Sequence, residues 1–173
     1  FSFLKDGQTV SFGGSMTLED TGMLTALRHD PGITLLDRAQ AKTPEETKKI
    51  YHDALSSDFY FMSTNAITKD GELVNIDGTG NRVAALIYGP EHVIVMAGMN
   101  KVAANVDEAL SRVHGTATPM NCKRLGKNTP CSATGVCSDC LSPDCICNQV
   151  VITRRSGIEG RIKVILIGEE LGY

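Results

Sequence analysis

The six cysteines of this 173-residue chain are confined to one segment, residues 122–147. Four of them follow the pattern Cys131-x5-Cys137-x2-Cys140-x6-Cys147. A C-x2-C pair places two sulfurs within reach of one metal ion or cluster, and flanking cysteines can complete four ligands. We therefore predict a site for zinc or an iron–sulfur cluster. Its ligands would be Cys131, Cys137, Cys140 and Cys147.

Two other interpretations of these cysteines stay open. Disulfides would staple the same loop, although such staples are typical of exported chains and no export signal is visible in this sequence. Free thiols, idle or redox-sensing, are the second alternative. The spacing matches neither the zinc ribbon nor the ferredoxin run, so the metal is not identified. Cys122 and Cys145 lie outside the predicted ligand set.

Length and composition predict one domain, residues 1–173, with a cysteine-rich loop at about 122–148. Hydrophobic residues make up 42% of the chain, and no window approaches a membrane span. The net charge of −3 gives no general attraction for nucleic acid or anionic lipid. We expect a cytoplasmic protein with no nucleic-acid or membrane partner. The chain begins at Phe1, without a methionine, which indicates that an N-terminal segment is missing from this numbering.

Apolar runs of strand length alternate with helical patterns along the chain. The predicted strands cover 9–12, 33–36, 59–62, 73–76, 92–97, 149–153 and 162–167. The predicted helices begin at a Thr17–Asp20 capping box and at Thr43, and two more cover 82–87 and 106–113. A hairpin turn is expected at 69–71. This alternation predicts an α/β three-layer fold with a mixed, largely parallel sheet.

Two glycine-rich segments follow predicted strands and precede predicted helices, which is where open α/β sheets bind ligands. They are Gly13-Gly14-Ser15 and Asp77-Gly78-Thr79-Gly80-Asn81-Arg82. Free backbone N–H groups there could hold a carboxylate or phosphate, and Arg82 could clamp an anion in bidentate fashion. Asp77 is the best-placed carboxylate for moving a proton. The alternative is that the glycines only permit tight turns.

Asn65 and Lys101 each follow a predicted buried strand. Polar residues at such positions often face a ligand, and Lys101 would supply a second cation for an anion. The alternatives are that Asn65 caps the turn and that Lys101 lies on the solvated surface. Neither glycine segment is a Walker or a full Rossmann signature. The four histidines form no Ser-His-Asp or Cys-His arrangement that the spacing reveals.

Several segments resemble the LUD-domain family of lactate-utilisation proteins. The likeness rests on residues 12–19, 63–68, 70–71, 75–85, 98–101, 121, 124–125, 147–148 and 169–173. It is closest to a stand-alone branch of unknown function that carries these cysteines and usually has an additional helical N-terminal segment. The resemblance implies the fold shared by ribose-5-phosphate isomerase, glucosamine-6-phosphate deaminase and CoA transferases.

The resemblance also implies a cytoplasmic bacterial protein associated with the oxidation of L-lactate to pyruvate, with iron–sulfur oxidoreductase subunits as partners. The family offers no agreed catalytic residue, and a glutamate nucleophile of the CoA-transferase kind is not recognisable here. The family motifs point to Gly13, Gly14, Ser15, Asn65, Asp77, Gly78, Gly80, Asn81, Arg82 and Lys101.

Three functional hypotheses follow from the sequence. The first is a LUD-domain protein that binds a small anionic metabolite, acting alone, as a homo-oligomer or as an oxidoreductase subunit. The second is a zinc or iron–sulfur metalloprotein that uses the cysteine loop for a redox or structural purpose. The third is a phosphosugar isomerase-like enzyme, which rests on fold analogy alone.

Overall fold

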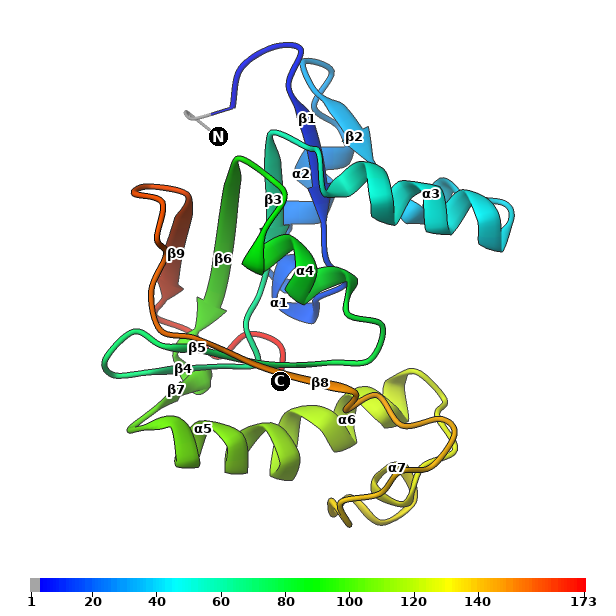
Figure 1. The fold of residues 1–173 in the computed structure, drawn as a ribbon, viewed down its shortest axis with the longest axis vertical. Helices are drawn as coiled ribbons and strands as arrows, with labels where there is room; N and C mark the ends of the chain where they lie inside the picture. The colour runs from blue at the N-terminus through cyan, green and yellow to red at the C-terminus, as the bar shows by residue number, and fades with distance from the viewer. Residues whose placement is uncertain (1–3) are drawn as a thin grey trace.

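The computed structural model describes residues 4–173, so residues 1–3 of the predicted domain lie outside the described part. Two β-sheets organise the chain (Figure 1). The strands of the larger sheet run close to vertical in this view, and the smaller sheet lies across their lower ends. The lower ends are the carboxyl ends, so the loops that leave the larger sheet meet the smaller one.

The larger sheet holds five strands that are all parallel, in the spatial order β2-β1-β3-β6-β9. They are β1 (Thr9–Phe12), β2 (Thr34–Leu36), β3 (Phe59–Met62), β6 (His92–Gly98) and β9 (Ile162–Ile167). Three of these strands have the predicted bounds, and the other two differ by one residue. Because neighbouring parallel strands need crossovers, helices must cover the faces of this sheet.

Two short helices, α1 (Met16–Asp20) and α2 (Met23–Arg28), connect β1 to β2. The predicted capping box at Thr17 is wrong, because Ser15 caps α1 by accepting from the N–H of Leu18 at 3.4 Å. Thr17 instead lies inside α1 and is fully buried. Its hydroxyl is therefore free to make a tertiary contact.

Helix α3 (Pro44–Ala54) leads from β2 to β3 and begins as predicted. The hydroxyl of Thr43 accepts from the N–H of Glu46 at 3.2 Å, and Pro44 occupies the first turn, where its missing N–H costs nothing. Helix α4 (Asn81–Ile87) precedes β6. Both helices pack on the face of the sheet opposite to α1 and α2.

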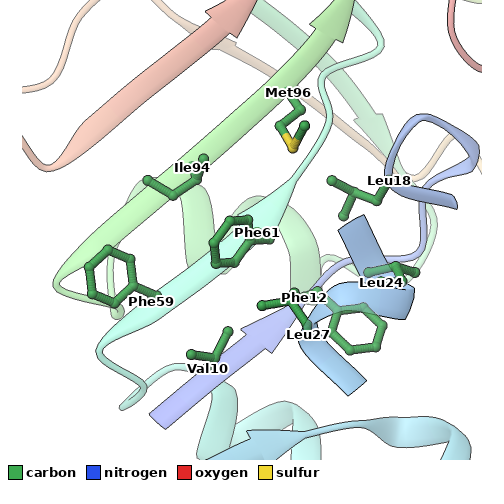
Figure 2. Packing of buried hydrophobic residues seen from close by; sticks show 9 residues of the cluster. All are labelled: Val10, Phe12, Leu18, Leu24, Leu27, Phe59, Phe61, Ile94 and Met96. Atoms are coloured by element: carbon green, nitrogen blue, oxygen red, sulfur yellow. The ribbon is translucent and has the colours of Figure 1, made fainter. Parts of the chain in front are cut away.

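Alternate residues of β3 point to opposite faces of the sheet and define two cores. Phe59 and Phe61 pack with β1, α1 and α2, and Figure 2 shows this cluster around the Phe61 ring. Tyr60 and Met62 pack with α4 and the end of α3. The three layers are thus α1 and α2, the parallel sheet, and α3 with α4. This confirms the predicted fold class.

The smaller sheet has the order β7-β4-β5-β8 and contains the antiparallel pairs. Its strands are β4 (Ala66–Thr68), β5 (Leu73–Asp77), β7 (Val102–Ala103) and β8 (Gln149–Thr153). The predicted turn at 69–71 joins β4 to β5, and Gly71 adopts the positive φ of 88° that it requires. The parallel pairs of the larger sheet and the antiparallel pairs of the smaller sheet thus belong to two separate sheets, where the sequence predicted one mixed sheet.

A helical segment longer than predicted covers the smaller sheet. Helix α5 (Val106–Arg112) runs into a π-helical stretch (Val113–Ala117) and then α6 (Thr118–Arg124), all with right-handed helical backbone at the junctions. The prediction ended this helix at Val113, but the helical backbone continues through Gly115 and Pro119, which are usual helix breakers. The wider π turn before Pro119 accommodates the missing N–H and lets the helix continue.

The predicted cysteine loop contains a further helix, α7 (Pro130–Thr134). Thr129 caps it, accepting from the N–H of Ser132 at 3.3 Å, and Gly135 ends it in the left-handed region. No helix within residues 4–173 is long and apolar enough to cross a membrane.

Candidate functional site

A cavity of about 430 Å³ lies where the carboxyl ends of the parallel strands face the smaller sheet. Loops after β1, β2, β3 and β6 contribute to its wall. The structure brings together eight of the sequence-predicted residues around it: Gly14, Ser15, Asn65, Asp77, Gly78, Asn81, Arg82 and Lys101. Gly13 and Gly80 do not line it. A Cβ at Gly13 would come within 3.1 Å of the Arg82 side chain, so this glycine allows close packing behind the wall.

Lys101 is the most buried cation of the wall, with only 4% of its surface exposed. Its Nζ donates to the Thr17 hydroxyl at 2.7 Å and to the Ser63 hydroxyl at 3.0 Å. Burial lowers the pKa of Lys101 to about 8, and the positive charges of Arg112 and Arg82 add to this effect. The side chain therefore joins β6, β3 and α1 at the floor of the cavity.

Arg82 uses its whole guanidinium within the protein. The Nε lies 3.3 Å from Oδ2 of Asp77. The other four hydrogen bonds go to the backbone oxygens of Ser63 and Ile76 and to the side-chain oxygens of Asn65 and Asn75. A guanidinium has five N–H donors, so none is left for the bidentate clamp that the sequence suggested. Arg82 contributes positive charge to the cavity and ties α4 to β3 and β5.

Asp77 is also engaged by its own loop. Its Oδ1 accepts from the N–H groups of Thr79 at 3.1 Å and Gly80 at 2.8 Å. These are the N–H groups that were expected to hold a ligand anion, and the carboxylate of Asp77 occupies them instead. These hydrogen bonds stabilise the loop that follows β5. The role of Asp77 in proton transfer stays a prediction.

Three further cations of the wall, Arg38, Arg124 and Lys127, were not predicted as ligand-binding residues. Arg38 follows β2, and its Nη1 donates to the Tyr51 hydroxyl at 3.3 Å. A Cβ at Gly14 would collide with Nη2 of Arg38. Gly14 therefore leaves the space in which the guanidinium approaches the loop after β1, a reason for glycine that the sequence did not reveal.

Charges on the cavity wall are unbalanced. Among the described residues, the wall holds five cations, Arg38, Arg82, Lys101, Arg124 and Lys127, and a single side-chain carboxylate, Asp77. The chain as a whole carries −3, so this excess is local. A concave surface lined by one sign of charge concentrates ions of the opposite sign. The cavity is thus suited to an anion.

Tyr173 adds an unpaired polar atom to the wall. Its hydroxyl is buried and has no hydrogen-bond partner among the described residues. The amide of Asn65 adds a donor: its Oδ1 is taken by Ile76 and Arg82, but its Nδ2 makes no hydrogen bond within residues 4–173. Buried polar groups normally find partners, so the Tyr173 hydroxyl is a candidate for contact with a ligand, and the Asn65 amide is a second donor on the wall.

The six cysteines carry free thiols and lie mostly away from the cavity, with only Cys145 on its wall. The Cys131 thiol lies 3.3 Å from the Thr129 hydroxyl, and the sulfur of Cys145 accepts from the backbone N–H of Cys147 at 3.4 Å. Burial raises the pKa of Cys122 to about 11 and that of Cys147 to about 12. Hydrogen bonds from Ser142 lower the pKa of Cys140.

This arrangement does not match the predicted metal centre. Across residues 4–173, no group of three or more His, Cys, Asp and Glu side chains is arranged to hold a metal ion. Cys137 instead lies 3.4 Å from Nδ1 of His114 in the π-helical stretch, a Cys-His contact that the spacing did not reveal. Within the described part of the chain, the cysteine side chains do not converge on a site for zinc or a cluster. The metal role of Cys131, Cys137, Cys140 and Cys147 stays a prediction.

Comparison with known proteins identifies the family. The family model of the LUD domain matches residues 2–167, so the chain belongs to the LUD-domain family. This confirms the resemblance on which the sequence analysis relied. Comparison with curated proteins gives no match.

Solved structures with a similar chain trace include a DUF162 family protein from Deinococcus radiodurans. It is 12% identical, with a TM-score of 0.40, over 94% of this chain and 88% of that one. The eIF2B delta subunit of Chaetomium thermophilum is 21% identical, with a TM-score of 0.37, over 63% of this chain and 47% of that one. Ribose 5-phosphate isomerase from Plasmodium falciparum is 14% identical, with a TM-score of 0.35, over 60% of this chain and 48% of that one. They are neighbours in fold type only.

Proposed function

We propose that this LUD domain binds a small anionic metabolite, a carboxylate or a phosphate, in the cavity at the carboxyl ends of the parallel strands. The observation that carries the proposal is the ratio of charges on the wall, five cations to one carboxylate. The carboxylate, Asp77, is already paired with Arg82. A ligand anion would therefore meet a net positive site without a competing acid.

The hydrogen-bond donors of the wall that have no partner in the described part of the protein would make the contacts with the anion. Only one guanidinium hydrogen bond of Arg38 is made within the described residues, so most of its fork is available for a bidentate contact with a carboxylate or phosphate. The amide of Asn65 and the hydroxyl of Tyr173 would add neutral hydrogen bonds. Arg82, with every donor used, would act through its charge.

Family membership suggests the physiological setting. LUD proteins are named for lactate utilisation, and we propose that the bound anion is L-lactate, pyruvate or a related short carboxylate. In that setting the domain would support lactate oxidation beside iron–sulfur oxidoreductase subunits in the cytoplasm. A phosphorylated sugar is the alternative anion, because a phosphate satisfies the same cations.

Isothermal titration calorimetry of the purified chain with L-lactate, pyruvate, inorganic phosphate and ribose 5-phosphate tests the proposal. We expect at least one of these anions to bind, with affinity that weakens as salt concentration rises. The Lys101→Gln variant should bind about tenfold more weakly, whereas Arg155→Gln, which removes an exposed charge outside the cavity wall, should bind like the wild type. Failure of all four anions to bind at millimolar concentration would overturn the proposal.

A further inference from the structure

Within residues 4–173, the amine of Lys101 has no carboxylate within ion-pair distance. Ion pairs among residues 4–173 are Arg28–Asp37, Lys49–Asp53 and Arg82–Asp77. The charged groups that act on Lys101 are Arg112 of α5 and Arg82 of α4, which disfavour its protonation, and Asp20 of α1, which favours it. A buried ammonium without a counter-ion is costly, so this lysine loses its proton more readily than a surface lysine.

The shift changes how much amine is available at neutral pH. With a pKa of about 8, roughly a quarter of Lys101 is neutral at pH 7.5, against about one in a thousand at the ordinary value of 10.5. Neutral amines are nucleophiles, and desolvated lysines in proteins react with carbonyl groups to form imines.

Two hydroxyl groups orient the amine. The Thr17 hydroxyl donates to the backbone oxygen of Leu171 at 3.1 Å, so it offers Lys101 a lone pair and accepts one N–H. The Ser63 hydroxyl can donate to the backbone oxygen of Thr64 at 3.2 Å and accepts a second N–H. The third position on the nitrogen carries the lone pair of the neutral amine. It is left for the cavity that Lys101 lines.

We propose that Lys101 forms an imine with the carbonyl group of a 2-oxo carboxylate bound in this cavity. The inference rests on the proposed function, because the cations of the wall hold the carboxylate and thereby place the adjacent carbonyl carbon near Nζ. The nitrogen lone pair attacks that carbon, the carbonyl oxygen takes up protons and leaves as water, and a C=N bond replaces C=O. One amine and one carbonyl thus give one imine and one water. The Ser63 hydroxyl, 3.0 Å from Nζ, is placed to pass a proton between nitrogen and oxygen.

Reductive trapping tests this step. The wild-type chain is incubated with pyruvate and cyanoborohydride, and the modified lysine is located by peptide mass spectrometry. We expect the reduced adduct at Lys101 to form at least tenfold faster than at exposed Lys163, with a rate that rises with pH around an apparent pKa of about 8. A merely structural lysine would show no such pH profile.

The Lys101→Arg variant is the matched control, because it keeps the positive charge and removes the nucleophile. It should give no adduct at position 101, with an unchanged circular dichroism spectrum as the check on folding. Pyruvate binding by the wild type without an adduct at Lys101 would overturn the imine and leave the anion site intact. Absence of any anion binding would overturn the proposed function as well. Equal labelling of surface lysines and Lys101 also contradicts the inference.

Discussion

The Nε of Arg82 lies 3.3 Å from Oδ2 of Asp77, and this ion pair joins the start of α4 to the end of β5. Both partners are otherwise fully engaged, Asp77 by its loop and Arg82 by oxygens from β5 and the segment after β3. The pair therefore holds the cavity wall in shape, and the ligand is left to the neighbouring cations.

Replacing the guanidinium of Arg82 should lower the stability of the fold and remove a positive charge from the cavity wall. We expect Arg82→Gln to lower the free energy of unfolding by about 3 kcal/mol, because it leaves the mostly buried carboxylate of Asp77 without its cation and frees several backbone and amide oxygens. Urea denaturation at pH 7 measures the change. Arg124→Gln is the control, since this exposed residue hydrogen-bonds, among the described residues, only with Asn121 three residues away. It should shift stability by less than about 0.5 kcal/mol. Equal effects of the two substitutions would contradict the structural role of Arg82.

Arg38 should act on the ligand and not on the fold. Its guanidinium is half-buried and makes one hydrogen bond, to Tyr51, so Arg38→Gln should reduce stability by about 1 kcal/mol or less. Affinity for the bound anion should fall about tenfold, with a weaker dependence on salt, because one charge-assisted contact is lost. Calorimetry at two salt concentrations measures the affinity and its dependence on salt. An unchanged affinity would remove Arg38 from the site.

The sequence predicted the strands well and the tertiary contacts poorly, for physical reasons. Phe59–Met62 is a short apolar run, and a strand buried on both faces leaves that local mark. Thr17 was predicted as a helix N-cap because Asp20 follows it at the spacing of a capping box. Its actual partner is Lys101, 84 residues further along the chain, which no local pattern can reveal. Arg38 was missed for a similar reason, because only the β2-β1 pairing brings it over Gly14.

The candidate cavity was predictable in outline because glycine loops after parallel strands meet at one edge of a sheet. The sequence could not show that the hydrogen-bonding groups of some wall residues are already used within the protein. Arg82 and Asp77 looked available for a ligand, and only their geometry shows that their donors and acceptors are taken. Thr129-Pro130 followed by Gly135 did carry a readable helix signal, an N-cap with proline in the first turn and a terminal glycine. The cysteines around it predicted a loop, and the structure has helix α7 there.

Tyr173 provides a substitution that separates binding from stability. Its hydroxyl is buried and has no partner within residues 4–173, so Tyr173→Phe should leave the free energy of unfolding unchanged or raise it by up to about 1 kcal/mol in the absence of ligand. If the hydroxyl donates to the bound anion, the same variant should bind several-fold more weakly. Thermal unfolding with and without ligand measures both effects. A loss of stability without ligand would show that the hydroxyl has a partner in the free protein.

Thiol reactivity should follow the surroundings of each cysteine. At pH 7.5 we expect iodoacetamide to modify Cys140 first, because hydrogen bonds from Ser142 favour its thiolate. Cys122 and Cys147 should be slowest, because burial raises their pKa to about 11 and about 12. Peptide mapping over time gives the order, and the rates should converge in urea. Joint protection of Cys131, Cys137, Cys140 and Cys147 with stoichiometric zinc or iron would instead support the metal hypothesis.

Stability should depend on pH through Lys101 in a defined direction. Its pKa is lowered from 10.5 to about 8 in the folded chain, so between these values the unfolded chain binds more protons and stability rises with pH. The gain over this range should be roughly 3 kcal/mol relative to Lys101→Met, which has no proton to lose at that position. The comparison with this variant matters because Tyr60, Cys122 and Cys147 have raised pKa values and oppose the trend in both proteins. Urea titrations at pH 7.5, 9 and 10.5 measure the difference, with Lys49→Met as an exposed control that should follow the wild type. Parallel pH profiles for the wild type and Lys101→Met would mean that Lys101 keeps its proton in the folded protein, and its amine would then not be available for the imine.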